Sequence, residues 1–240
     1  MELKTLNLQG QTKPAAAPDH FAELPEVWDV FGVTSPQPVV VIVGGAGMMT
    51  DEEIAKIQTF FERWLIPFIL EQKAVVIEGG TDAGVMAAIG RAYHKTRAEF
   101  PLVSVAAREI EGLLGDLEIH HTHYILCPGN DWGDESEWIA AAASALAGSK
   151  PSATLLFNGG QIAWKDAAFS LKYKRPILVA EGSGRTADIV ARTKHWRAFN
   201  LRALRLLRSG LIYTANPFQE PDKFMTALHQ LMKPSKKETK

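Results

Sequence analysis

The chain has 240 residues, of which 46% are hydrophobic and 22% charged, a composition typical of a globular protein and not of a disordered one. Its formal net charge of −1 removes any bulk attraction to nucleic acid or anionic membranes, although a local basic patch stays possible. The single cysteine excludes an intrachain disulfide and a zinc site built from this chain's thiolates alone.

The first twelve residues are polar, and no stretch of eighteen or more apolar residues occurs anywhere in the chain. A signal peptide needs a basic segment followed by an apolar run, and a membrane-spanning helix needs about 20 apolar residues. We therefore expect a cytoplasmic protein without a membrane span.

Residues 1–37 are rich in turn-forming residues, including four prolines, which predicts an irregular arm with a short helix near residues 21–31. From Pro38 onward, short β-branched runs alternate with helical patterns. The expected strands are 39–43, 74–78, 102–106, 123–127, 153–157 and 176–180, with a possible seventh at 211–214. The expected helices are 51–71, 83–96, 134–146, 163–173, 186–208 and 222–232.

The strands are almost continuously apolar, which favours a parallel sheet covered by helices on both faces. Their spacing of about 25–35 residues is that of right-handed βαβ units. We predict an α/β fold, a Rossmann-like doubly wound, mostly parallel sheet of six to seven strands. It would form a single domain over residues 38–232, followed by a disordered basic tail at 233–240.

Glycine-rich turns follow four of these strands, at residues 44–47, 79–84, 159–160 and 182–184. Glycine lets the backbone approach a ligand closely, and N–H groups at the start of the next helix can bind anionic oxygens. Such turns also need glycine for tight packing alone, and that alternative stays open for each of them. The first turn has Thr50 where a dinucleotide fingerprint needs glycine, although Thr50 and Glu53 form a capping box pattern. There is no P-loop motif, so nucleoside triphosphate hydrolysis is not expected.

Residues 79–86, G-G-T-D-A-G-V-M, resemble the G-G-T-x-x-G-V-M turn of the SLOG superfamily. This superfamily includes the lonely-guy (LOG) phosphoribohydrolases, the Smf/DprA proteins and the N-terminal cytosolic domains of melastatin-type TRP channels. His121-Thr122-His123-Tyr124 is similar to a His-x-His-aromatic strand of the channel branch, and residues 181–188 are similar to its E-G-S-G-R-x-A-D segment. Over roughly residues 38–192, the chain resembles a prokaryotic TRPM-like SLOG domain of the LSDAT type.

The resemblance implies a sensor-like protein whose strand-end loops bind a nucleotide-derived ligand, such as ADP-ribose or a related adenine nucleotide. It implies no required cofactor and no metal, and a homo-oligomer or an effector protein would carry the output. The ligand-binding residues implied are Gly44, Gly45, Ala46, Gly47, Gly79, Gly80, Thr81, Gly84, Val85, Met86, Gly159, Gly160, Glu181, Gly182, Ser183, Gly184 and Arg185.

An enzymatic alternative is N-glycosidic hydrolysis of a nucleoside monophosphate, as in LOG proteins. Their P-G-G-x-G-T-x-x-E motif is altered in this chain, where Ile162, Ala163 and Asp166 replace the later Gly, Thr and Glu. A binding module is therefore favoured over an enzyme, with Asp166 as the catalytic candidate if hydrolysis occurs. A DNA-binding role by analogy with Smf/DprA has only a basic segment in its favour, and we do not expect it.

Two other groups of residues have two interpretations each, and Cys127 has one. His120, His121 and His123 are interpreted as structural or ligand-edge residues rather than metal ligands, because a clear third ligand is missing. The acids of residues 130–135 either stabilise a helix N-terminus or bind ribose hydroxyls or a cation. Cys127, at the end of an apolar strand, is expected to be buried.

Residues 191–210 contain six basic residues and no acid. With Trp196, Phe199, Leu206 and Leu207 as an apolar stripe, the segment predicts one amphipathic basic helix. A solvated outer face is the favoured interpretation, and a surface for an oligomer, nucleic acid or a membrane is the alternative.

Overall fold

The computed structural model describes residues 1–234, so the last six residues of the expected tail lie outside it. The strands are β1 (Glu2–Leu8), β2 (Gln11–Ala17), β3 (Val39–Gly44), β4 (Val75–Glu78), β5 (Leu102–Ala107), β6 (His123–Cys127), β7 (Ser152–Phe157), β8 (Ile177–Ala180) and β9 (Ile212–Ala215). The helices are α1 (Leu24–Val30), α2 (Asp51–Phe60), α3 (Ile66–Gln72), α4 (Gly84–Thr96), α5 (Leu113–Asp116), α6 (Ser136–Ala147), α7 (Gln161–Lys172), α8 (Arg185–Lys194), α9 (Leu201–Leu207) and α10 (Pro221–Leu231). A 3₁₀ turn, η1 (Phe21–Glu23), and a π-helical turn, η2 (Phe61–Leu65), complete the set.

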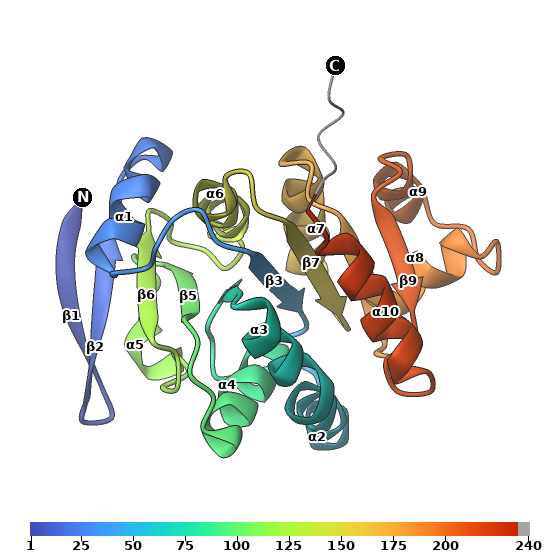
Figure 1. Ribbon diagram of the computed structural model, residues 1–240, viewed down its shortest axis with the longest axis horizontal. Coiled ribbons are helices and arrows are strands. Elements are labelled where there is room, and N and C mark those ends of the chain that lie inside the picture. Colours follow the sequence, from blue (N-terminus) through green and yellow to red (C-terminus); the bar gives the residue numbers. More distant parts are fainter. Residues whose placement is uncertain (235–240) are drawn as a thin grey trace.

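All nine strands form one sheet in the order β1-β2-β6-β5-β4-β3-β7-β8-β9 (Figure 1). Every pairing is parallel except that between β1 and β2. From β3 the chain first adds strands on one side, through β4, β5 and β6, and later on the other, through β7, β8 and β9. The predicted Rossmann-like α/β fold is confirmed, and its topological switch point lies at β3, where such sheets bind ligands.

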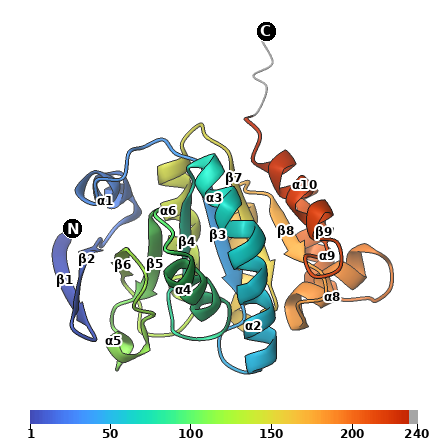
Figure 2. The same ribbon diagram turned by 60° about the horizontal axis from the view of Figure 1, so that its bottom comes forward.

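The apolar strands separate two hydrophobic cores, one on each face of the sheet. Val39, Val41 and Val43 of β3 point into a core shared with α1, α6, α7, α8 and α9. Val40 and Ile42 point into the other core, with α2, η2, α3, α4 and α10. Figure 2 shows α2, α3 and α4 together on the near side of the sheet. Successive residues of a strand point to opposite faces, so a sheet covered by helices on both faces needs apolar residues at every position.

The segment predicted as an irregular arm instead supplies two strands, which is why the sheet has nine strands and not six or seven. Gln9 and Gly10 both have positive φ, as in a type I′ turn, and close an antiparallel hairpin. Only Ala15 and Ala16 of β2 pair with β6. Pro14, which has no N–H to donate, lies just before that pairing begins. The expected short helix is present as η1 and α1.

The helical prediction for residues 51–71 holds, with one local change. The capping box is confirmed, because Thr50 Oγ1 accepts from Glu53 N and Glu53 Oε2 accepts from Thr50 N. Pro67 cannot donate a helical hydrogen bond, and the chain passes through η2 immediately before it.

The single helix predicted at 186–208 is wrong, because residues 195–200 separate α8 from α9. Trp196 has φ +59°, a left-handed conformation that ends the helix, and Asn200 Oδ1 accepts from Ala203 N to start the next one. The expected apolar stripe is therefore divided: Leu206 is buried, whereas Trp196 and Phe199 are exposed. Among residues 1–234, no helix is long and apolar enough to cross a membrane.

Candidate functional site

A cavity of about 560 Å³ opens at the carboxyl ends of β3, β4 and β7, at the switch point of the sheet. We call it the switch-point pocket. Its volume is within the range of about 300–1,000 Å³ that small-molecule sites occupy. The pocket is lined by Ile42, Val43, Gly44, Ala46, Gly47, Gly79, Thr81, Asp82, Ala83, Met86, Gly115, Asp116, Trp132, Glu135, Ile139, Gly160, Gln161, Ile162, Asp166 and Arg185.

Eight of the predicted ligand-binding residues line this pocket: Gly44, Ala46, Gly47, Gly79, Thr81, Met86, Gly160 and Arg185. Nine others do not line it: Gly45, Gly80, Gly84, Val85, Gly159, Glu181, Gly182, Ser183 and Gly184. The four glycine turns thus come together at one edge of the sheet, but the residues within each turn differ in what they contact.

The turns after β3 and β4 pack against each other. A Cβ on Gly84, which has φ +53°, would lie 2.0 Å from the carbonyl oxygen of Gly45. Val85 N donates to that same oxygen at 2.9 Å. By contrast, a Cβ on Gly47 or Gly79 would meet no atom within 4 Å. Gly84 therefore permits the contact between the turns, whereas Gly47 and Gly79 leave space at the pocket wall.

The E-G-S-G-R segment connects β8 to α8 and is hydrogen-bonded to the turn after β7. Ser183 Oγ accepts from Asn158 N at 2.8 Å and donates to Ala180 O at 2.6 Å, and Asn158 Nδ2 donates to Ser183 O at 2.8 Å. Gly182 N donates to Asp188 Oδ1 at 2.7 Å, which fixes the turn to α8. These bonds hold the backbone that delivers Arg185, the member of the segment that reaches the pocket.

Of the helices that begin beside the pocket, α7 and α8 differ in the state of their first N–H groups. The first amides of α8 are satisfied, because Thr186 N and Ala187 N donate to Gly159 O and Asn158 O. At α7, Gly160 occupies the N-cap without a side-chain cap, and within residues 1–234 no acceptor binds Gln161 N or Ile162 N. The positive end of α7 therefore faces the cavity with free donors.

Arg185 lies next to this helix start. A Cβ on Gly160 would be 3.4 Å from Nη2 of Arg185, so the guanidinium covers the glycine. Arg185 also has φ +44°, an unusual conformation for a residue other than glycine. A guanidinium and free helical N–H groups together form a binding site for anionic oxygens.

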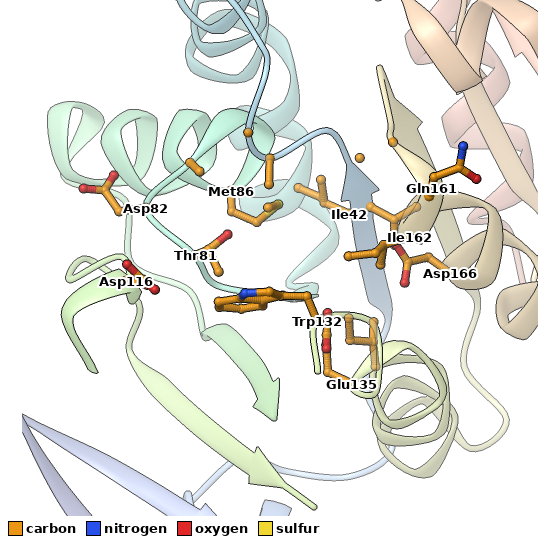
Figure 3. A pocket seen from close by; sticks show the side chains of 18 of the residues that line it. Ile42, Thr81, Asp82, Met86, Asp116, Trp132, Glu135, Gln161, Ile162 and Asp166 are labelled. Atoms are coloured by element: carbon orange, nitrogen blue, oxygen red, sulfur yellow. The ribbon is translucent and has the colours of Figure 1, made fainter. Parts of the chain in front are cut away.

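Two carboxyl groups form one end of the pocket. Asp166 Oδ1 accepts from Ser136 Oγ at 2.5 Å, and both Asp166 and Glu135 are buried. Burial raises the pKa of Asp166 to about 7, with a further increase from the charge of Glu135, although the hydrogen bond from Ser136 opposes the shift. Burial also raises the pKa of Glu135. Figure 3 shows both side chains at the same end of the pocket.

The opposite end of the pocket carries Asp82 and Asp116, and the indole of Trp132 lies between the two ends (Figure 3). Asp82 N donates to Asp116 O at 2.7 Å, so the loops after β4 and before β6 form one rim. Trp132 is 40% exposed, which leaves a face of its ring free for a ligand. These residues were not among the predicted ligand-binding positions.

Trp132 and Glu135 come from the segment 130–135, for which a helix-capping and a ligand-binding interpretation were open. The structure supports each interpretation for a different part of this segment. Asp134 Oδ2 accepts from Asn130 N and Asp131 N and so stabilises the loop, whereas Trp132 and Glu135 line the pocket. Their position after a strand that ends at the same edge was the one sequence signal that could have identified them.

The three histidines lie outside the pocket. His121 precedes β6 and is fully buried, with Nε2 2.6 Å from Glu78 Oε1 and Nδ1 2.9 Å from Glu118 Oε2. Burial alone would lower the pKa of His121, but its contacts with Glu118 and Glu78 raise it to about 9. The charged imidazolium joins the end of β4 to the loop before β6, which is the structural one of the two roles expected for it. Cys127 is buried, as predicted.

Comparison with solved structures finds the fold of this chain elsewhere. The molybdenum cofactor binding protein from the phototrophic bacterium Rippkaea orientalis superposes with a TM-score of 0.55 at 11% sequence identity. The match covers 82% of this chain and 99% of that one. At this identity the likeness concerns the fold alone. A search of curated protein sequences found no match.

A family model identifies the family of this chain, which the structural likeness alone does not show. The model described as "SLOG in TRPM, prokaryote" matches residues 37–224, which is most of the chain and includes β3 to β9. The resemblance inferred from the glycine turns and the E-G-S-G-R segment is confirmed. The chain belongs to the family of prokaryotic TRPM-type SLOG domains.

Proposed function

We propose that this SLOG domain binds ADP-ribose or a related adenine nucleotide in the switch-point pocket and acts as a sensor or carrier. The observation that carries the proposal is the pairing of Arg185 with the uncapped start of α7 at the pocket wall. Together they provide a charged fork and free N–H donors for a phosphate. Among residues 1–234, neither Arg185 nor the start of α7 forms a salt bridge with a charged side chain.

The rest of the pocket suits the other parts of such a ligand. The exposed face of Trp132 offers a stacking surface for a base. Asp82 and Asp116 carry carboxylate oxygens that accept hydrogen bonds from ribose hydroxyls. Asp82 and Asp116 repel an anion, whereas Arg185 and the free N–H groups of α7 attract one, so a phosphate is favoured beside Arg185. A domain that binds without reacting needs an output, which self-association or an effector protein would provide.

Thermal unfolding with a panel of ADP-ribose, ADP, AMP and adenosine tests this proposal. A ligand at about 100 times its Kd adds about 2.7 kcal/mol to the stability of the folded state. In a chain of this size that corresponds to a Tm increase of roughly 5–10 °C. Arg185→Ala should abolish most of the increase, and Arg185→Lys should restore part of it, because lysine keeps the charge and loses the planar fork.

Arg192→Ala is the matched control, because Arg192 lies on the same helix, is exposed and does not line the pocket. Its ligand response should equal that of the unmodified chain. Absence of any Tm shift with the whole panel at millimolar concentration would rule out the proposal.

The carboxyl pair favours a second candidate function, N-glycosidic hydrolysis of a nucleoside monophosphate. A carboxyl group with a pKa near 7 can supply a proton at neutral pH, and Asp166 meets that requirement at the pocket wall. In this reaction water adds to the anomeric carbon, the C–N bond breaks, and the free base leaves with a proton.

Chromatography of AMP incubated with the protein distinguishes the two functions. Release of free adenine that Asp166→Asn abolishes would establish hydrolysis. Intact AMP, together with a Tm increase that survives in Asp166→Asn, would establish binding without reaction.

A further inference from the structure

The segment between α8 and α9 exposes large apolar side chains. Trp196 is 89% exposed, Phe199 79% and Leu201, the first residue of α9, 63%. In Figure 1 this segment is drawn at the outer edge of the molecule, at the end of the sheet opposite to the N-terminal hairpin. Three large apolar residues exposed within six positions form a patch of the kind that marks an interaction site.

The segment is held in place by contacts that leave these side chains free. Arg197 N donates to Arg192 O at 2.8 Å and Trp196 N donates to Thr193 O at 3.2 Å. Glu181 Oε2 lies 3.4 Å from Nε2 of His195, and Asn200 caps α9. Trp196 has φ +59°, the left-handed conformation that ends α8, so its backbone is held in a defined turn. The aromatic side chains are therefore presented to solvent by an ordered backbone.

Basic residues surround this patch. Arg192, Lys194, Arg197, Arg202, Arg205 and Arg208 are all exposed, and no acid occurs in residues 191–210. Arg202 and Arg205 lie on α9 and Arg208 is its C-cap, and all three are exposed beside the buried Ala203 and Leu206. Among residues 1–234, Glu181 is the one acid within salt-bridge distance of these basic residues, with its Oε1 3.7 Å from Nη1 of Arg197. The patch thus combines protruding apolar side chains with a strongly positive rim.

We propose that this surface, formed by Trp196, Phe199, Leu201 and the six basic residues, docks the protein on an anionic phospholipid bilayer. The apolar side chains would enter the interface between headgroups and acyl chains, where Trp is favoured, and the arginines would contact the phosphates. The protein would lie on the membrane surface and would not cross it.

Two features favour a bilayer over other anionic or apolar partners. A second copy would bring like charges together across the contact, which costs several kcal/mol in a protein interface. A single-stranded nucleic acid would stack on aromatic rings along a groove. Here the aliphatic Leu201 belongs to the patch, and none of its three apolar residues lines the switch-point pocket.

Flotation with lipid vesicles tests the proposal with the intact, ligand-free protein. The protein should float with phosphatidylglycerol-rich vesicles and not with pure phosphatidylcholine vesicles, and added salt should weaken binding. The double variant Trp196→Ser/Phe199→Ser should lose binding at least tenfold while its Tm stays unchanged, because both side chains are exposed.

A second double variant tests how the basic residues contribute to vesicle binding. Arg205→Gln/Arg208→Gln should weaken vesicle binding about thirty-fold, since each basic residue near an anionic surface contributes about 1 kcal/mol and 1.4 kcal/mol is a factor of ten. Leu3→Ser is the matched control, because Leu3 is 58% exposed at the opposite end of the sheet. It should float like the unmodified chain.

Three results would overturn the proposal. One is a lack of flotation with anionic vesicles, or flotation that the aromatic double variant leaves unchanged. Another is binding to a single-stranded oligonucleotide that requires Trp196 and Phe199 while vesicles fail to bind. The third is a dimer in sedimentation velocity that the same double substitution dissociates, since this would assign the surface to a second copy.

Discussion

At the scale of single residues, Asp166 combines burial with a position at the pocket wall. The residue is 7% exposed, its carboxyl group accepts a hydrogen bond from Ser136 Oγ, and the charge of Glu135 acts on it. The native structure therefore favours the protonated form of Asp166, whereas the unfolded chain releases the proton at a pKa near 3.9. The difference makes Asp166 a source of pH-dependent stability.

The sign of this dependence is determined by the raised pKa. Between pH 4 and pH 7 the folded state holds a proton that the unfolded state has lost, so the free energy of unfolding decreases as pH rises. Each pKa unit corresponds to 1.36 kcal/mol, and a shift from about 3.9 to about 7 corresponds to about 4 kcal/mol.

Asp166→Asn should therefore increase the free energy of unfolding at pH 8, by up to about 4 kcal/mol, and should increase it much less at pH 5. The amide oxygen can still accept from Ser136 Oγ. Urea unfolding at the two pH values measures the effect. Equal differences between variant and parent at both values would show that Asp166 is not held protonated in the folded state.

At the scale of elements, the turns after β3 and β4 assign different roles to similar glycines. Gly84 has a positive φ and no room for a Cβ beside Gly45 O, whereas Gly79 faces open space in the pocket. Both glycines belong to the same motif, and the sequence alone predicts a ligand contact for each. The difference arises from the packing of one turn on the other, which no local pattern encodes.

Gly84→Ala should destabilise the fold by about 3 kcal/mol or more, because it adds steric overlap with backbone to an unfavourable φ. Gly79→Ala should keep the Tm close to that of the parent and should weaken ligand binding by reducing the pocket. Thermal unfolding with and without ligand measures both effects. A Gly84→Ala variant as stable as Gly79→Ala would contradict this distinction.

The elements also show what kind of information the sequence lacks. The strands from β3 to β9 and the capping box at Thr50 follow from local patterns, and they were predicted close to their observed positions. The break between α8 and α9 was missed, because the basic and apolar periodicity continues through residues 195–200. Asn200 was the available signal for a new helix start.

At the scale of the whole molecule, the N-terminal hairpin closes one edge of the sheet. Leu6 and Leu8 of β1 are buried in a third apolar cluster with Tyr124 and Leu126 of β6. The hairpin was not predicted from the sequence, because proline and alanine have a low β propensity. Its partner strand lies more than a hundred residues further along the chain, so its stability depends on tertiary contacts.

Leu6→Ala/Leu8→Ala should lower the Tm by roughly 10 °C or more, because each buried Leu→Ala change costs about 2–5 kcal/mol and a chain of this size loses about 2–4 °C per kcal/mol. Leu3→Ala, at an exposed position of the same strand, is the control and should change the Tm by a degree or so. Differential scanning calorimetry measures both. If the double variant melted like the control, the hairpin would not belong to the cooperative unit.

The location of the candidate site could be predicted at this scale, but not its full lining. Glycine turns at parallel strand ends identify the correct edge of the sheet. Asp116 follows β5 and Trp132 follows β6, and both reach the pocket only because these strands lie on one side of β3 and the segments after them extend along the same edge. Strand order is a property of the assembled sheet, and no local pattern in a single sequence predicts it.

The bonds that hold the pocket loops are separate from the side chains that face the cavity. Ser183 with Asn158, Gly84 with Gly45, and Asp82 N with Asp116 O fix the loops through contacts outside the cavity or through backbone atoms. Thr81, Met86, Trp132 and Ile162 line the pocket without taking part in these bonds. Substitution at those four positions can change which molecule fits while the loops keep their shape. Such a scaffold can acquire new ligands by ordinary point mutation during evolution, without first losing its fold.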